Sequence, residues 1–137
     1  MRINSECARK VLIEVEKIGY GESISVSELQ KKLGYPMNEV LNVIFQFSSE
    51  DYINMLDRRS YDTGPIYDSS RIVSLTKKGC YVLDDIRSDE TWNMVKEKLS
   101  NFDEISFFTL VNIIGKINEC SYNKLFNLPE DFIGAWK

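Results

Sequence analysis

The feature that most constrains the fold is a strand that ends directly before a helix, in residues 72–86. Val73 and Leu75 alternate with polar Ser74, which is the pattern of a half-buried strand. Thr76 follows at the position of a helix N-cap, where a hydroxyl can accept a hydrogen bond from the first turn. The apolar positions of that helix are Gly79, Val82, Leu83 and Ile86. The end of the strand and the start of the helix are therefore fixed relative to each other.

Gly79 adds a second constraint at this junction. Glycine has no Cβ atom, so the helix can lie close to whatever packs against it. The pattern Leu-Thr-x-x-Gly-x-x-x-Leu, which begins at Leu75, is typical of a winged helix-turn-helix domain where its β-hairpin, the wing, returns to the helical body. We therefore expect residues 52–56 to form the first wing strand and residues 71–75 its antiparallel partner.

Three helices are expected before the hairpin, as in such a domain. The first follows Ser5, and a very short strand is expected at residues 24–26. Ser27 then caps a short helix that ends at Gly34, and Pro36 opens the third helix. The predicted apolar stripe of the third helix is Met37, Val40, Leu41, Ile44 and Phe47. The charged residues of the first helix, which are expected in solvent, are Glu6, Arg9, Lys10, Glu14, Glu16 and Lys17.

The third helix would be the recognition helix, whose outer face lies in the major groove of DNA. The residues predicted on that face are Asn38, Glu39, Asn42, Gln46 and Ser49. Asparagine and glutamine can each read adenine with two hydrogen bonds, but this helix has no arginine or lysine to bind phosphate. The helix alone therefore gives weak support for DNA binding.

The loop between the wing strands, residues 57–70, is longer than most hairpin loops and mixes basic, acidic and aromatic side chains. The basic residues assigned to phosphate contacts are Arg58, Arg59 and Arg71, with Lys31 and Lys32 as further candidates. The candidates for protein contacts in the loop are Tyr61, Asp62 and Tyr67. An ordinary surface loop is the alternative.

The C-terminal part is expected to form helices that pack on this domain. Ser88 or Asp89 caps the first of them, and Trp92 is predicted to anchor it in the core. The next helix, residues 105–117, is apolar on most sides and has to be covered. Either residues 122–137 fold back over it, or a second copy covers it in a homodimer. The candidate interface residues here are Phe108 and Trp136.

These elements predict an α+β fold, with a winged helix-turn-helix domain at residues 1–87 and a C-terminal helical extension at residues 88–137 packed on it. At 137 residues the chain can bury a core without disulfides or metal. The three cysteines have no C-x-x-C spacing and are expected to be small buried residues. The first residues lack the apolar core of a signal peptide, and no segment is expected to span a membrane, so we expect a cytoplasmic protein.

Histidine is absent from the chain, which excludes Ser-His-Asp and Cys-His catalysis and histidine-based metal sites. The paired acidic residues Asp84-Asp85 and Glu50-Asp51 are adjacent in sequence, so each pair points to different faces of a helix and forms no dyad. We therefore expect neither enzymatic activity nor a bound cofactor or metal.

The charge distribution distinguishes between partners. The chain has a net charge of −4, and residues 36–70, which contain the predicted recognition helix and wing loop, carry two basic and six acidic side chains. Surfaces that bind nucleic acid are normally basic because they neutralise phosphates. The acidic segment therefore favours a protein partner over DNA.

Residues 75–99 are similar to a family of small phage and prophage proteins, the YjcQ-like proteins and their uncharacterised relatives. The positions that continue this similarity after the wing are Asp84, Ile86, Arg87, Asp89, Trp92, Asn93, Val95, Lys96, Glu97 and Lys98. Family members often carry a histidine and an aromatic residue where this chain has Cys80 and Lys77. The resemblance implies a winged-helix architecture and a phage or prophage setting, and it implies no reaction.

Two functional hypotheses follow. In the first, the protein is a DNA-binding regulator that reads bases with Asn38, Asn42 and Gln46 and binds phosphates with its arginines. In the second, it is an interaction module that modulates a host or anti-phage defence protein through an acidic surface that includes Glu39.

Overall fold

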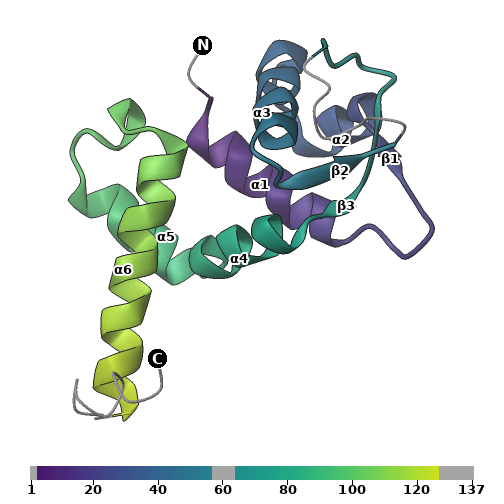
Figure 1. Ribbon diagram of the computed structural model, residues 1–137. Helices are drawn as coiled ribbons and strands as arrows, with labels where there is room; N and C mark the ends of the chain where they lie inside the picture. Colours follow the sequence, from purple (N-terminus) through teal and green to yellow (C-terminus); the bar gives the residue numbers. More distant parts are fainter. Residues whose placement is uncertain (1–2, 57–63, 127–137) are drawn as a thin grey trace.

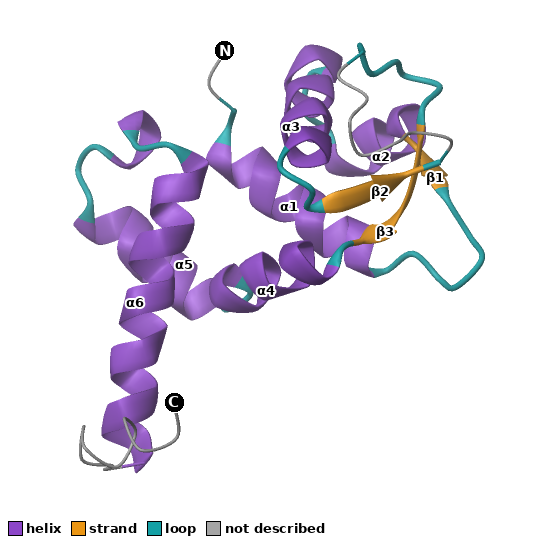
Figure 2. Ribbon diagram, in the orientation of Figure 1, coloured by secondary structure: helices purple, strands orange, loops and turns teal. Residues whose placement is uncertain are grey.

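The computed structural model describes residues 3–56 and 64–126, with side chains up to residue 120, and has an α+β fold (Figure 1). The strands are β1 (Ile24–Ser25), β2 (Ile53–Met55) and β3 (Arg71–Leu75). The helices are α1 (Ser5–Glu16), α2 (Val26–Leu33), α3 (Met37–Ser49), α4 (Lys77–Ile86), α5 (Asp89–Lys98) and α6 (Phe107–Phe126), with the short 3-10 helix η1 (Phe102–Glu104) before α6. Figure 2 shows α5 and α6 on the side of the molecule away from the small sheet.

The three strands form one antiparallel sheet in the order β1-β3-β2. Ile53 pairs with Leu75, and Asn54 pairs with Ser74. The register then shifts by one residue, so that Met55 pairs with Ile72, and this irregularity is typical of a β-bulge. The predicted antiparallel pairing of residues 53–56 with residues 71–75 is confirmed.

The junction of β3 and α4 has the geometry that its sequence predicts. The Thr76 side chain accepts a hydrogen bond from the Gly79 N–H at 3.0 Å and donates one to the Asp51 carbonyl at 2.6 Å. Gly79 lies so close to the chain before β2 that a Cβ atom on it would be 2.0 Å from the Tyr52 carbonyl oxygen. Only glycine therefore fits at this position without a shift of the backbone.

The start of α2 differs from the prediction. Ser25 and not Ser27 is the N-cap, because its hydroxyl accepts the Glu28 N–H at 3.1 Å. The N–H groups of Val26 and Ser27 donate to the carbonyls of residues 70 and 68, at 2.9 Å each. The chain before β3 thus satisfies the first donors of α2, and the helix begins two residues earlier than predicted.

The prediction that the charged side chains of α1 are solvated is wrong for Arg9, which is only 6% exposed. Its guanidinium donates to the carbonyls of Ile86 at 2.8 Å and Arg87 at 2.9 Å, and to the Asp89 carboxylate at 2.6 Å. It also lies over the Trp92 ring, 5.3 Å from the centroid. Arg9 therefore ties α1 to the junction of α4 and α5, where carbonyl groups at the end of α4 need donors.

Glu6 and Glu16 extend this connection along α1. The Glu6 carboxylate accepts hydrogen bonds from Trp92 Nε1 at 3.1 Å and pairs with the Lys96 ammonium at 2.7 Å. Glu16 binds the Arg87 guanidinium with two hydrogen bonds, at 2.7 and 2.6 Å. Trp92 itself is buried, which confirms its predicted role as the anchor of α5.

Helix α6 packs against α4 and α5 with its first half and continues away from the body of the molecule (Figure 1). Phe107 is fully buried, and its ring centroid lies 5.6 Å from that of Phe47 on α3. The ring centroid of Phe108 lies 5.9 Å from that of Tyr52. The first half of α6 is therefore covered by its own chain. Residues 127–137 lie outside the described part of the chain. The predicted return of residues 122–137 over the apolar helix therefore stays a prediction.

The structure also bears on two further predictions, the burial of the cysteines and the absence of a membrane-spanning helix. Cys7 is buried as predicted, and burial raises the pKa of its thiol to about 12. Cys80 and Cys120 are exposed, so the prediction is wrong for these two. Among the described helices, none combines the length and the apolar composition that crossing a bilayer requires.

Candidate interaction surface

The turn between α2 and α3 fixes the direction of α3. Helix α2 ends at Gly34, which has a left-handed φ of 76° and donates its N–H to the Gln30 carbonyl at 2.9 Å. The Gln30 side-chain amide in turn donates to the Tyr35 carbonyl at 2.7 Å. The Lys10 ammonium of α1 lies 5.5 Å from the centroid of the Tyr35 ring. Contacts from α2 and from α1 therefore fix the turn from which α3 starts.

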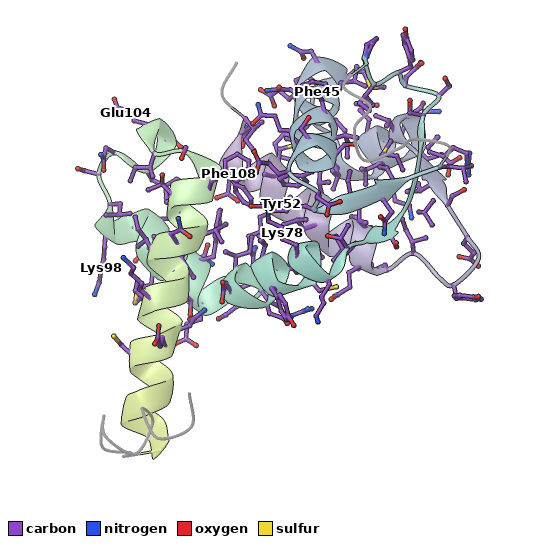
Figure 3. All side chains as sticks on the ribbon, in the orientation of Figure 1. Phe45, Tyr52, Lys78, Lys98, Glu104 and Phe108 are labelled. Carbon is purple, nitrogen blue, oxygen red and sulfur yellow. The ribbon has the colours of Figure 1, made fainter. Side chains whose placement is uncertain are left out.

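One face of α3 is fully buried in the core, and the residues of the opposite face, here called the outer face, are partly buried or exposed. The fully buried residues of α3 are Val40, Val43, Ile44 and Phe47. The outer face consists of Asn38, Leu41, Asn42, Phe45, Gln46 and Ser49. Phe45 is partly buried and stands in the middle of this face (Figure 3). The residues predicted on the outer face are all polar, and in the structure Leu41 and Phe45, which are partly buried and pack against the core, add an apolar stripe to it.

The segment that leads into β3 lies beside this stripe. Leu41, Asn42 and Phe45 line a shallow recess together with Pro65 and Ile66, which we call the apolar groove. Ile66 is 8% exposed and belongs to the hydrophobic core. The chain before β3 thus extends the apolar surface of α3.

A second recess, which we call the acidic cavity, opens where α3 meets the start of α1 and η1. It has a volume of about 310 Å³. Its lining consists of Ile3, Asn4, Ser5, Glu6, Glu39, Asn42, Phe102 and Asp103. Asn42 lines both recesses, so they are adjacent on the surface. The acidic cavity is therefore lined by residues of α3, of the start of α1 and of η1.

The three carboxylates of the acidic cavity differ in their partners. Burial of Glu6 alone would raise its pKa, but the hydrogen bonds from Lys96 and Trp92 outweigh this effect and lower the pKa of the carboxyl group. No lysine or arginine forms an ion pair with Glu39 or Asp103 in the part of the chain that the structure describes. The Lys96 ammonium also interacts electrostatically with the exposed Asp103, so Glu39 is the carboxylate of this lining that has no basic partner among the described residues.

Among the described residues, the predicted DNA contacts do not form one basic ridge. Arg71 is turned toward β1, where its guanidinium donates to the Ser23 hydroxyl at 2.7 Å and the Ser23 carbonyl at 3.0 Å. The Gln46 amide donates to the Asn42 side chain at 3.1 Å, so these amides are already engaged. Asn38, Lys31 and Lys32 are exposed. Arg58 and Arg59 lie outside the described residues.

The described members of the predicted protein contacts lie apart from one another as well. Glu39 lies in the acidic cavity, and Tyr67 is 61% exposed in the segment before β3. Phe108 is partly buried beside Tyr52 (Figure 3). Tyr61, Asp62 and Trp136 lie outside the described residues. Of the members of this set that the structure describes, only Glu39 lines one of the two recesses beside α3.

The sequence contains a signal for the apolar groove. Asn38, Asn42, Phe45 and Ser49 follow the spacing of residues on one helix face, so Phe45 is marked as an outward aromatic residue. The acidic cavity had no such signal, because Glu39 and Asp103 are far apart in sequence and only the fold brings them together. Within the described ranges, no group of three or more Cys, Asp or Glu side chains is arranged to hold a metal ion.

Comparison with known families shows which family the chain resembles. A family model described as "Hypothetical protein (DUF2513)" matches residues 2–104, which end just before α6. No curated protein and no solved structure gives a significant match to the chain. The YjcQ-like resemblance of residues 75–99 gains no support from these comparisons and stays a prediction.

Proposed function

The chain belongs to the family described as "Hypothetical protein (DUF2513)", and we propose that it is a winged-helix interaction module that binds another protein through the outer face of α3. The phage or prophage setting of this proposal comes from the YjcQ-like resemblance of residues 75–99. The partner, in that setting, is a host or anti-phage defence protein whose activity the module changes.

The order of the elements supports the winged-helix part of the proposal. Helix α1, β1, α2 and α3 are followed by the hairpin of β2 and β3, and β3 lies between the other two strands. A helix-turn-helix with this hairpin is the arrangement that a winged-helix domain requires. The C-terminal helices α5 and α6 are then additions to this body.

The surface beside α3 supports the functional part of the proposal, which is the binding of another protein. Its acidic cavity and apolar groove meet at Asn42, and α3 has no arginine or lysine between Met37 and Ser49. DNA recognition depends on positive charge opposite the phosphates, whereas protein interfaces are built around apolar centres with polar rims. The apolar centre and acidic rim of this surface support a protein partner.

Affinity capture from a lysate of the native host tests the proposal. The wild-type protein is expected to retain a partner that Phe45→Asp does not retain, because a charge is placed in the apolar groove. Asn38→Arg tests the same face at an exposed position, and Lys31→Glu is the control on α2. Thermal unfolding shows that each variant is folded. Capture that survives both outer-face changes, or that nuclease treatment removes, contradicts the proposal.

DNA binding is the second candidate, and one observation favours it. Lys31 and Lys32 are exposed in the last turn of α2, and neither has an acidic partner among the described residues. A gel shift with duplex DNA at low salt tests this candidate. If it holds, the logarithm of the association constant falls with the logarithm of salt by about 0.9 for each phosphate contact, and Lys31→Glu reduces that slope.

A further inference from the structure

The acidic cavity and the apolar groove together define the chemistry of what can bind across α3. We infer that the bound segment of the partner carries a lysine or arginine next to an apolar side chain, with the cation in the acidic cavity and the apolar group in the groove. This inference rests on the proposed function and specifies the partner.

The charge of the acidic cavity selects a cation. Glu39 has no ion-pair partner among the described residues, while Lys96 pairs with Glu6 and also interacts electrostatically with the exposed Asp103. The Asn4 and Ser5 side chains add polar groups, and Ile3 and Phe102 add apolar surface for the aliphatic part of a long side chain. A volume of about 310 Å³ lies at the lower end of the range of ligand pockets, which suits a single side chain.

The apolar groove provides the second contact within reach of the first. Leu41 and Phe45 are one helical turn apart, and Ile66 closes the groove from the segment before β3. Because Asn42 lines both recesses, a short peptide can place one side chain in each. The combination rejects polyanions, since a phosphate backbone would face the carboxylates of Glu39 and Asp103 and gain nothing from the groove.

Selection from a display library of random dodecapeptides on the immobilised full-length protein tests the inference. Enriched peptides are expected to carry Lys or Arg within four positions of Leu, Ile, Met or an aromatic residue. An enriched peptide is then synthesised, and its dissociation constant is measured by fluorescence anisotropy.

Variants on both recesses separate the two contacts. Glu39→Gln and Phe45→Ala are each expected to raise the dissociation constant about tenfold or more, as for interface residues at a central contact. Lys98→Gln, at an exposed position on α5, is the matched control and is expected to leave binding unchanged. Replacement of the basic residue of the peptide by Met weakens binding to the wild type but has no further effect on the Glu39→Gln variant.

Several results overturn the inference. These are enrichment of no peptide, enrichment of peptides without basic residues, and binding that is insensitive to Glu39→Gln. Binding that depends on Phe45 and not on Glu39 overturns the inference while the proposed function stands. Binding that is insensitive to both changes, together with host capture that ignores Phe45→Asp, removes the proposed function as well.

Discussion

A missing Cβ atom at Gly79 allows α4 to approach the start of β2. Thr76 holds the first turn of α4, and its backbone N–H donates to the Tyr52 carbonyl at 3.0 Å. The same carbonyl oxygen occupies the space that a side chain on Gly79 would need. The position of α4, and of everything that packs on it, therefore depends on this residue.

Gly79→Ala is expected to lower the free energy of unfolding by about 1–3 kcal/mol or more, because the new methyl group overlaps backbone and not a flexible side chain. Gly115→Ala on α6 is the matched control. Its Cβ atom would lie 3.2 Å from Asp85 Oδ2, at the end of a side chain that can move. Because alanine also favours a helix by about 1 kcal/mol over glycine, this control is expected to be neutral or stabilising. Equal urea midpoints for the two variants would refute the close approach.

The Glu16–Arg87 pair predicts a specific dependence on pH. Hydrogen bonds from Arg87 lower the pKa of the Glu16 carboxyl group below its usual value of 4.5. A lowered pKa in the folded state stabilises the protein above pH 4.5, and the contribution is lost as the pH falls through the folded-state value. Both side chains are about half exposed, so solvent screening keeps the effect under about 1 kcal/mol.

Urea unfolding at pH 7 and pH 3 measures this contribution. The loss of stability between the two is expected to be smaller for Glu16→Gln than for the wild type, and high salt is expected to reduce the difference. Glu97→Gln, at an exposed position on α5, provides the comparison. Identical losses for the wild type and Glu16→Gln would mean that the pair contributes nothing.

At the scale of elements, the features that could be predicted from the sequence are those that depend on residues close together in the chain. The Thr76 cap, the left-handed Gly34 and the pairing of β2 with β3 all follow from patterns a few residues long. The start of α2 was missed because its first N–H groups bind carbonyls of residues 68 and 70, which no local pattern contains. The role of Arg9 was missed for the same reason, since its partners lie 77 or more positions away.

Arg9 therefore gives the clearest test of how α1 is joined to α4 and α5. Arg9→Met is expected to cost about 2–4 kcal/mol of stability, because two carbonyl groups at the end of α4 lose a charged donor. Lys17→Met, which removes only a surface pair with Glu14, is expected to change stability by less than about 1 kcal/mol. Comparable losses for the two variants, measured by urea unfolding, would show that the Arg9 contacts are not specific.

At the scale of the whole molecule, α6 lies beyond the segment that matches the family and still completes the core. Phe107 is fully buried, whereas Phe108 is only partly buried. Phe107→Ala is expected to cost about 3–5 kcal/mol, as for a core phenylalanine. Phe108→Ala is expected to cost no more than about 2 kcal/mol, because part of its ring already contacts water. If thermal unfolding ranks the two variants the other way, α6 does not pack as described.

The outer face of α3 shows where prediction from sequence ends for the candidate site. Helix α3 was predicted from the sequence, and Glu39 and Asn42 were identified as candidates for contacts with a partner. The apolar groove and the acidic cavity were not predicted, because Pro65, Ile66 and Asp103 reach α3 only through the fold. The division of the chain at residue 87 stays a prediction.

Photo-crosslinking from the outer face tests the central claim most directly. A benzophenone amino acid is placed at exposed position 38 on α3 and, in a separate variant, at exposed position 98 on α5 as the control. After irradiation in host cells, we predict an adduct at position 38 that protease degrades and nuclease does not, with none at position 98. An adduct at position 38 that nuclease degrades, or protein adducts at position 98 alone, would contradict the account.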